Sequence, residues 1–307
     1  MQPLPDVQAL RSPHDFRLTR VGVRGIRKPL QVRRPGAPHP TTTVVVVDAY
    51  VDLPGHQRGI HMSRNVEAIN EAIDQAVRAP VRGIEDLAGG IAADLLKRHD
   101  YATVAEVDIE ADYFLERAQP SGQRSIEAYN LVAQARAERG RELRRAIGAL
   151  VTGINACPCA METARRMLEE RGEVRTGPNI THNQRNRTLL MVETGDGAQV
   201  EANDLIDLVE ASLSAPTYEI LKRGDEARLV IRAHERPLFV EDVVREVLDA
   251  VVRKYAALPG DAVVSVRSEA EESIHKHNAF AERVTTLEEL RGAERAAGSR
   301  PARATDA

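Results

Sequence analysis

The chain has 307 residues, of which 42% are hydrophobic and 29% are charged. At roughly 150 residues per domain, this length predicts two domains, and the composition excludes a disordered or fibrous chain. The formal net charge of -4 at pH 7 argues against a protein that binds nucleic acid mainly through its backbone phosphates. No apolar run approaches the roughly 18 residues of a transmembrane helix, and the first residues lack the pattern of a secretory signal. We therefore expect a cytoplasmic protein without nucleic-acid or membrane partners.

Hydrophobic patterning divides the first half into two strands, two helices and two more strands. The strand segments are rich in β-branched residues or alternate between apolar and polar residues, and the helical segments carry apolar residues three to four positions apart. Ser63 is the expected N-cap of the first helix, because a side-chain oxygen there satisfies a free backbone N–H. In chain order, the predicted elements cover residues 16–23, 43–52, 63–77, 84–100, 105–117 and 125–137.

The second half repeats this order, which predicts an internal duplication and an α+β fold. A segment at 142–155 is expected to pair with the preceding strand across Gly140. Further strands are predicted at 186–193, 228–232 and 262–267, helices at 161–171, 202–213 and 239–255, an extended segment near His275, and a frayed helix from 287 onward.

The two cysteines, Cys157 and Cys159, stand on either side of Pro158. Two thiols this close do not form a disulfide framework, and a cysteine thiolate is a metal ligand and a nucleophile. Pro158 argues against a regular strand here, so the spacing leaves open whether one sulfur or both reach a given ion. Two buried thiols that only fill the core are the alternative.

Histidine and carboxylate side chains gather in two further runs. The run THNQR places His182 and Arg185 directly before an apolar strand, where they suit the floor of a pocket, with a surface loop as the alternative. The run EESIHKHN offers Glu272 and His275, groups that suit proton transfer. In an extended chain these two side chains lie on opposite faces, whereas in a helical turn they meet on one side. A solvated, charged edge is the alternative for this run.

Two segments suit phosphate binding because they combine basic side chains with a loop or a helix start. They are LKRGDE, with Lys222, Arg223 and Glu226, and HQRGIHMSR, with Arg58, His61, Ser63 and Arg64. A solvated loop and a plain N-cap are the respective alternatives. In FVED, Glu241 lies in the first turn of a helix, where an acidic side chain also stabilises the helix dipole. The joint occurrence of these segments with the cysteines and histidines indicates a metal site next to a phosphate site.

In order and spacing, the segments DLPGHQRGIHMSR, CPC, THNQR, LKRGDE, FVEDVVRE and ESIHKHNAFAER resemble the type IB GTP cyclohydrolases, a metal-dependent family of the pterin pathway. The resemblance implies tandem tunnelling-fold (T-fold) modules, in which antiparallel sheets carry helix pairs on one face and assemble into a barrel. The expected modules are 1–140 and 141–290, the second with most of the metal and catalytic residues, followed by a flexible tail at 291–307. A homotetramer with active sites at subunit interfaces is also implied.

By this resemblance, the substrate is GTP, whose imidazole ring is opened at C8 with release of formate. The product is 7,8-dihydroneopterin triphosphate or its 2′,3′-cyclic phosphate, at the first step of pterin and folate biosynthesis. A divalent ion would activate the attacking water, with Fe(II) or Mn(II) favoured and Zn(II) possible. The implied ligands are Cys157, His182 and Glu226, with Cys159 as the alternative to Cys157. The implied proton-transfer residues are Glu272 and His275, the purine ligand is Glu241, and the triphosphate would bind some of Arg58, His61, Ser63, Arg64, Arg185, Lys222 and Arg223.

Two features depart from the family pattern. The 22 residues between Cys159 and His182 form a longer insertion than in compact bacterial members, closer to the archaeal branch, which leaves the form of the product open. Gly224 stands where relatives commonly carry proline, which loosens the loop but keeps Glu226.

Two other functions stay open at this point. One is a related T-fold enzyme such as a nitrile reductase with a cysteine nucleophile, which bound metal would argue against. The other is a non-catalytic interaction protein with core cysteines, in which Cys157→Ala would change stability alone.

Overall fold

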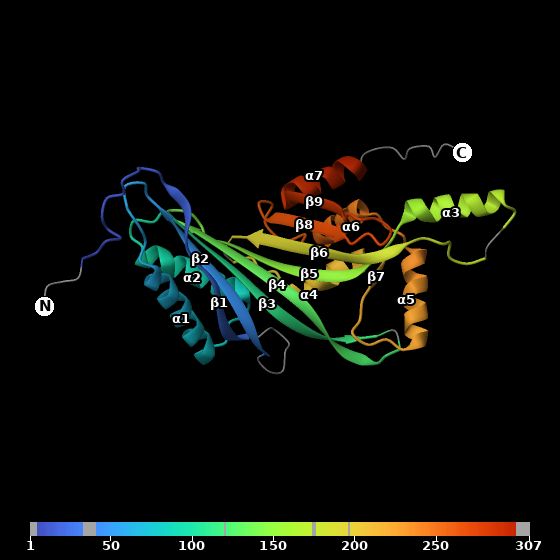
Figure 1. Cartoon of the computed structure of the whole chain (residues 1–307), viewed down its shortest axis with the longest axis horizontal. Helices are drawn as coiled ribbons and strands as arrows, with labels where there is room; N and C mark the ends of the chain where they lie inside the picture. The colour runs from blue at the N-terminus through green and yellow to red at the C-terminus, as the bar shows by residue number, and fades with distance from the viewer. Residues whose placement is uncertain (1–4, 33–40, 120, 174–175, 196, 299–307) are drawn as a thin grey trace. The chain divides into compact units, whose positions relative to one another are not determined.

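Figure 1 shows the computed structural model of the chain, which describes residues 5–32, 41–119, 121–173, 176–195 and 197–298. The strands are β1 (Leu18–Val32), β2 (Thr41–Leu53), β3 (Val104–Ala118), β4 (Arg124–Glu138), β5 (Arg144–Ala156), β6 (Asn183–Thr194), β7 (Ala215–Pro216), β8 (Val263–Ala270) and β9 (Ala279–Thr286). The helices are α1 (Met62–Arg78), α2 (Ile84–Arg98), α3 (Pro158–Glu170), α4 (Ala202–Ser212), α5 (Arg223–Glu235), α6 (Val240–Lys254) and α7 (Leu287–Gly298).

The order β1-β2-α1-α2-β3-β4 recurs as β5-β6-α4-α6-β8-β9. In the second series α3 is inserted after β5, and β7 and α5 are inserted after α4. This confirms the predicted repeat of the element order and the α+β class. Within the described ranges, the strands pair in the order β1-β2-β3-β4-β5-β6-β8-β9 with β7 on β5, and no pairing joins β1 to β9. The sheet of one chain is therefore open, and a barrel stays a prediction for the assembly.

The chain forms two compact units. Unit 1 comprises Met1–Tyr113, Asn130–Ile147 and Glu193–Gly197, and unit 2 comprises Phe114–Tyr129, Gly148–Val192 and Ala198–Ala307. The strands β3, β4, β5 and β6 each have residues in both units. The predicted boundary at residues 140 and 141 lies in the turn between β4 and β5, and the division into two modules there stays a prediction.

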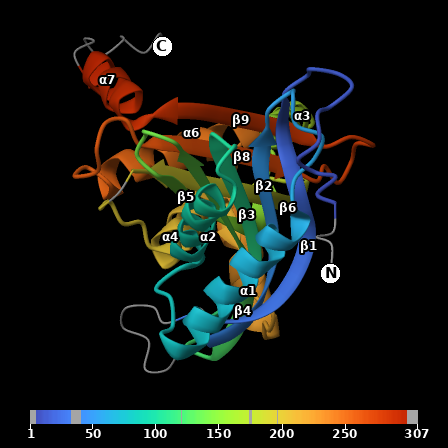
Figure 2. The same cartoon turned by 90° about the vertical axis from the view of Figure 1, so that its left-hand side faces the viewer.

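In unit 1, β2 pairs antiparallel with β1 and β3, and α1 and α2 lie beside these strands (Figure 2). Along β2, Val45, Val47 and Ala49 are fully buried and alternate with more exposed residues, as expected for a strand with one covered face. The helix α1 buries Ile69 and Ile73, which are one turn apart. The core of unit 1 therefore lies between the helix pair and the strands.

The strand β1 continues well beyond the predicted end at residue 23. The register with β2 shifts between Val23 and Ile26, and Gly25 there adopts a φ of 72°. Its backbone N–H donates to Asp48 Oδ1 at 2.6 Å. A β-bulge at Gly25 therefore allows β1 to continue past a glycine, a residue type that often marks a turn.

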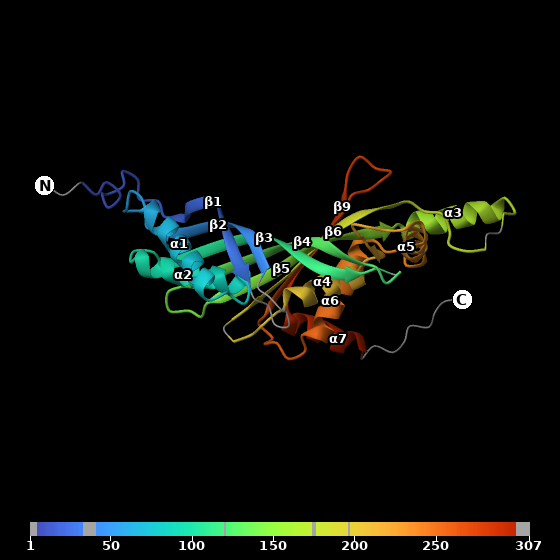
Figure 3. The same cartoon turned by 90° about the horizontal axis from the view of Figure 1, so that it is seen from below.

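In unit 2, α4 and α6 lie on the same side of the strands (Figure 3), with α6 packed on β8 and β9. The helix α6 buries Val243, Val247 and Val251, spaced by one turn. Next to α4, β7 pairs with β5 through Gly153 and Pro216, and a Cβ on Gly153 would lie 2.9 Å from the carbonyl oxygen of Ala215. Glycine is therefore required for this close approach of β7.

The predicted strand at 228–232 is wrong, because these residues belong to α5. Leu229 and Ala233 are buried in a cluster with Ala215, whereas Val230 and Ile231 are 50% and 46% exposed. A short apolar run does not distinguish a strand from the buried stripe of a helix, and the spacing of the two buried residues is helical.

The predicted N-cap at Ser63 is also wrong. The helix α1 begins at Met62 with His61 as its N-cap, and no side chain provides a hydrogen bond at this cap. Ser63 therefore lies in the first turn. The helix α7 covers residues 287–298, where a helix is predicted from 287 onward, so residues 291–298 of the predicted flexible tail are helical. Residues 299–307 of that tail lie outside the described residues. None of the helices in the described part of the chain combines the length and the hydropathy needed to cross a membrane.

Candidate functional site

Backbone hydrogen bonds bring four of the predicted motifs together in unit 2. The N–H of Cys157 donates to the carbonyl of His182 at 3.1 Å, which joins the end of β5 to the start of β6. The N–H of Glu271 donates to the carbonyl of Arg185 at 2.8 Å, which places the segment after β8 beside β6. The N–H of Leu238 donates to the carbonyl of Ala156 at 3.0 Å, which places the entry of α6 beside the cysteine motif. The segments CPC, THNQR, FVED and EESIHKHN therefore meet at one end of the unit 2 strands.

The two cysteines occupy different environments. Cys157 is the N-cap of α3 and is partly buried, and its Sγ accepts a hydrogen bond from the N–H of Ala160 at 3.4 Å. Pro158 takes the first helical position, where its missing N–H costs nothing. Cys159 is exposed in the first turn. The local structure thus places Cys157, and not Cys159, against His182.

His182, Gln184 and Glu272 form a hydrogen-bonded group. The imidazole Nδ1 of His182 lies 2.9 Å from Gln184 Oε1 and 3.6 Å from Glu272 Oε2. Gln184 Nε2 donates to Glu272 Oε1 at 3.3 Å. The side chains of His182 and Glu272 are only 11% and 13% exposed, so these contacts are largely shielded from water.

Two further imidazole rings extend this group along the loop between β8 and β9. The rings of His182 and His275 meet edge to face with centroids 6.4 Å apart, and His277 stacks on His275 at 5.1 Å. His275 thus lies beside His182, and its role in proton transfer stays a prediction. The sequence reasoning did not select His277 or Gln184, although the one-residue spacing of the two histidines was a signal for His277.

Glu226 lies exposed in the first turn of α5, after the N-cap Lys222 and Arg223. The neighbouring Asp225 is buried and pairs with Arg228 at 2.7 Å, and this guanidinium holds the pKa of Asp225 below its usual range. Asp225 therefore secures the start of the helix, and Glu226 keeps its carboxylate in solvent.

The predicted metal ligands offer the types of donor atom that a divalent transition-metal ion accepts. They are a thiol, an imidazole and a carboxylate, and the Nδ1 contact of His182 leaves its Nε2 without a partner among the described residues. Across the described ranges, however, no three His, Cys, Asp or Glu side chains lie close enough together to hold an ion. The set of Cys157, His182 and Glu226 therefore stays a prediction.

Glu241 and Asp242 occupy the first turn of α6 with different roles. Asp242 Oδ2 accepts the N–H of the N-cap Phe239 at 3.1 Å, and Asp242 Oδ1 also accepts from Arg245 at 2.8 Å. The structure gives Glu241 no hydrogen-bond partner in the part of the chain that it describes, so its carboxylate is available to a ligand.

The remaining predicted phosphate ligands, Arg58, His61, Ser63 and Arg64, belong to unit 1. Two of them already have partners there: His61 Nε2 lies 3.1 Å from Asp6 Oδ1, and Arg64 donates to the carbonyl of Arg98 at 2.7 Å. A role of these four residues in binding phosphate stays a prediction.

A cavity of about 420 Å³ in unit 2 contains Arg185 among its lining residues. Three glutamates, Glu127, Glu210 and Glu219, also line it. Tyr129 donates to Glu210 Oε1 at 2.6 Å, and burial raises the pKa of both groups. Because carboxylates dominate its lining, this cavity is a poor site for a triphosphate.

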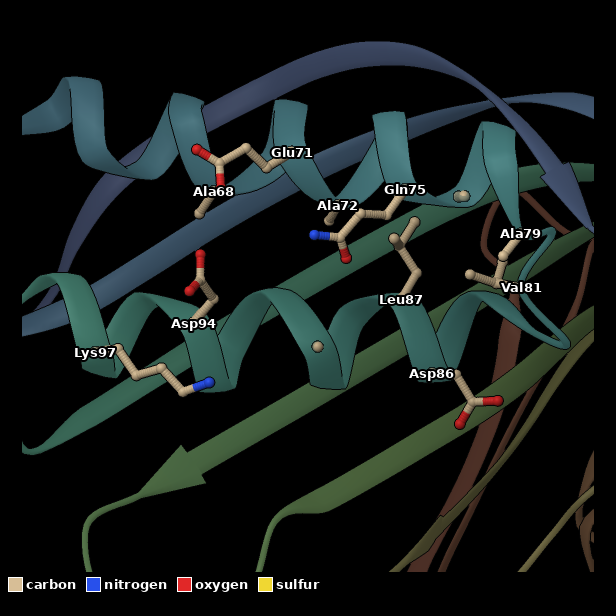
Figure 4. A pocket seen from close by; sticks show the side chains of 12 residues that line it. Ala68, Glu71, Ala72, Gln75, Ala79, Val81, Asp86, Leu87, Asp94 and Lys97 are labelled. Carbon is tan, nitrogen blue, oxygen red and sulfur yellow. The ribbon is translucent and has the colours of Figure 1, made fainter.

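A second cavity of about 440 Å³ lies between α1 and α2 in unit 1 (Figure 4). Glu71, Asp94 and Lys97 line it, and none of the predicted site residues does.

Comparison with known proteins identifies the family of this chain. Residues 4–281 match the family model described as type I GTP cyclohydrolase folE2. The chain is 42% identical over 303 residues to a protein of Methanocella arvoryzae named GTP cyclohydrolase MptA 2, with 94% of this chain and 98% of that protein covered. It is also 42% identical over 302 residues to GTP cyclohydrolase MptA of Methanothermobacter thermautotrophicus, with 94% and 95% covered.

Among solved structures, uricase from Arthrobacter globiformis superposes with a TM-score of 0.52 at 10% identity, covering 87% of this chain and 93% of that one. This likeness concerns the fold alone. The match to the family model and the identity to the two archaeal proteins both span nearly the whole chain. The chain therefore belongs to the type I GTP cyclohydrolase family.

Proposed function

We propose that this protein is a metal-dependent GTP cyclohydrolase of type IB, built on the tunnelling fold. The observation that carries the proposal is the contact between His182 and Glu272, with the backbone of Cys157 bonded to that of His182, where β5, β6 and β8 meet. Family membership supports GTP as the substrate. The likeness to uricase supports the fold, and by resemblance to the family the active form is a homotetramer with sites at subunit interfaces.

Cleavage of the guanine imidazole ring consumes two waters. The first adds to C8 and breaks one C8–N bond, and the second breaks the other C8–N bond and releases C8 as formate, with each freed nitrogen taking a proton. A divalent ion, Fe(II) or Mn(II) in preference to Zn(II), held by Cys157, His182 and Glu226 would lower the pKa of water enough for attack at neutral pH. Glu272 accepts the proton of the attacking water, and His275 donates a proton to the leaving nitrogen.

We assign substrate binding to charged residues at the starts of α5 and α6. The carboxylate of Glu241 accepts hydrogen bonds from the ring N–H and exocyclic amine of guanine, a pattern that adenine does not offer. Lys222 and Arg223 at the start of α5 bind the triphosphate. Arg185 is not assigned to the triphosphate, because it lines the cavity that carboxylates dominate. Arg58, His61, Ser63 and Arg64 of unit 1 complete this binding in the assembly.

The form of the product follows from the archaeal character of the chain. The insertion after Cys159 forms α3, and the relatives named MptA come from archaea. We therefore expect the 2′,3′-cyclic phosphate, formed when the neighbouring side-chain hydroxyl attacks the α-phosphorus and diphosphate leaves, whereas the bacterial branch of the family forms the triphosphate.

The proposal is tested under anaerobic conditions. Chelator-stripped protein receives GTP with Fe(II), Mn(II) or Zn(II) in turn, and formate and oxidised pterin fluorescence are measured. Metal-dependent formate with a fluorescent pterin is expected, and resistance of the product to a phosphomonoesterase identifies the cyclic phosphate. A folded protein that releases no formate with any of the three ions would contradict the proposal.

A further inference from the structure

The side chain of Gln184 links two residues of the site and is itself 9% exposed. It lies on the buried face of β6, between the exposed residues Asn183 and Arg185. We infer that Gln184 is a positioning residue that fixes the tautomer of His182 and the orientation of Glu272. This inference rests on the proposed function, because it assigns His182 to the metal.

An ionised carboxylate, such as that of Glu272, can only accept hydrogen bonds. The amide group of Gln184 that faces Glu272 Oε1 at 3.3 Å must therefore be the NH₂ end. The carbonyl oxygen of the same amide then faces His182. One carboxylate thus determines which way the glutamine amide points.

The orientation of the amide in turn selects the tautomer of the neutral His182 ring. A carbonyl oxygen only accepts, so Nδ1 of His182, at 2.9 Å, must carry the hydrogen. Glu272 Oε2, at 3.6 Å from the same Nδ1, favours a hydrogen there as well. A neutral imidazole protonated on Nδ1 keeps its lone pair on Nε2, which is the atom left to bind an ion.

Gln184 also holds Glu272 in place for proton transfer. Glu272 lies on the loop after β8, whereas Gln184 lies within the regular pairing of β6. The hydrogen bond between them therefore ties a loop carboxylate to a rigid strand. Loss of an outer-shell partner of this kind typically lowers metal affinity or activity by about 10- to 100-fold.

Three variants of the full-length protein test the inference. Gln184→Leu removes both contacts with little change in size. Gln184→Glu keeps an acceptor for Nδ1 but replaces the donor to Glu272 with a second carboxylate. Gln119→Leu is the matched control, because Gln119 is a buried glutamine of the same unit whose Nε2 donates to Ser125 at 3.3 Å, outside the site.

The first measurement is the tautomer of His182 in the metal-free protein, read from long-range ¹H–¹⁵N correlations of the imidazole nitrogens at a pH where the ring is neutral. Nine histidines are present, and the signal lost in His182→Gln identifies the ring. We expect Nδ1–H in the wild type, in Gln184→Glu and in Gln119→Leu, and a shift to Nε2–H in Gln184→Leu. Retention of the Nδ1–H tautomer in Gln184→Leu overturns the inference.

The second measurement is Mn(II) affinity together with the kinetics of GTP turnover. Gln184→Leu is expected to weaken Mn(II) binding by about 10- to 100-fold. Gln184→Glu is expected to lower kcat with little change in KM for GTP, because only the position of Glu272 is disturbed. Gln119→Leu is expected to lose thermal stability without a change in either quantity.

The outcomes separate this inference from the proposed function. If the wild type binds no Mn(II) and releases no formate, the proposed function fails, yet the tautomer measurement still decides whether Gln184 controls His182. If Gln184→Leu does not fold, an unchanged kcat in Gln184→Glu overturns the inference. A loss of stability in both leucine variants with unchanged tautomer and Mn(II) affinity shows a merely structural role.

Discussion

The N–H of Cys157 donates to the carbonyl of His182 at 3.1 Å, which holds the N-cap of α3 against the first residues of β6. This contact joins the backbones of the two residues and uses neither side chain. In the described part of the chain, the Sγ of Cys157 accepts only the N–H of Ala160, and the Nδ1 contact of His182 leaves its Nε2 for a ligand.

The two cysteines are expected to differ in function. Cys157→Ala should lower metal affinity and kcat by more than about 100-fold, because losing a ligand costs more than losing an outer-shell partner. Cys159→Ala should stay close to the wild type, since Cys159 is exposed on the first turn of α3. Metal content after dialysis and formate release measure both effects. The opposite result would move the ligand to Cys159.

The first turn of α6 offers a matched pair of acidic residues. Glu241→Gln should lower kcat/KM for GTP by about 10- to 100-fold, because a charge-assisted hydrogen bond contributes about 1.5–3 kcal/mol. Asp242→Asn should weaken the cap, by about 1 kcal/mol, and leave KM unchanged. Steady-state kinetics and urea unfolding of both variants measure these effects. If both variants changed KM for GTP equally, Glu241 would not be a specific ligand of guanine.

Stability should fall in mildly acidic solution because of His99. Burial lowers the pKa of this imidazole to about 4, and Asn65 Oδ1 lies 2.9 Å from its Nε2. The unfolded chain binds a proton near pH 6.5 and the folded chain does not, so stability decreases as the pH falls from about 6.5 towards 4. The loss approaches about 3 kcal/mol at the acidic end.

Urea unfolding at several pH values measures this effect. His99→Gln removes the titrating group, so its free energy of unfolding should depend less on pH across the same range. A variant with the same slope as the wild type would assign the acid sensitivity to other groups.

The helical assignment of residues 223–235 is tested by two neighbouring apolar residues of α5. Leu229→Ala should cost about 2–3 kcal/mol, because Leu229 is buried against β7. Ile231→Ala should cost less than about 0.5 kcal/mol, because Ile231 lies on the exposed face. In a strand, these two residues would share one face and respond alike. Thermal unfolding of both variants distinguishes the two structures.

Patterns within single segments predicted most of the fold. The valines of α6 and the alternation in β2 appear in the structure because each reflects one buried face. The prediction for the α5 segment was wrong because the run LVI at 229–231 fits both helical and strand periodicity. Only the packing of Leu229 on β7 distinguishes the two. The predicted N-cap of α1 was wrong because His61 occupies that position, without a side-chain hydrogen bond.

The site was harder to predict because its contacts join distant residues. His182 and Glu272 lie far apart in sequence, and only the pairing of β6 with β8 brings them within 3.6 Å. The resemblance supplied both residues, but the role of Gln184 between them depends on which face of β6 it occupies. A ligand set completed by Glu226 stays a prediction, because its side chain extends into solvent from α5.

The sharing of strands between the two units limits how the chain can be divided. A break at residues 140 and 141 leaves the first piece without 141–147 and Glu193–Gly197 of unit 1, while it still carries Phe114–Tyr129 of unit 2. Neither piece then contains a complete unit. The two halves of the repeat are therefore not independent folding units. Fragments that are produced separately should regain structure only when they are mixed and associate.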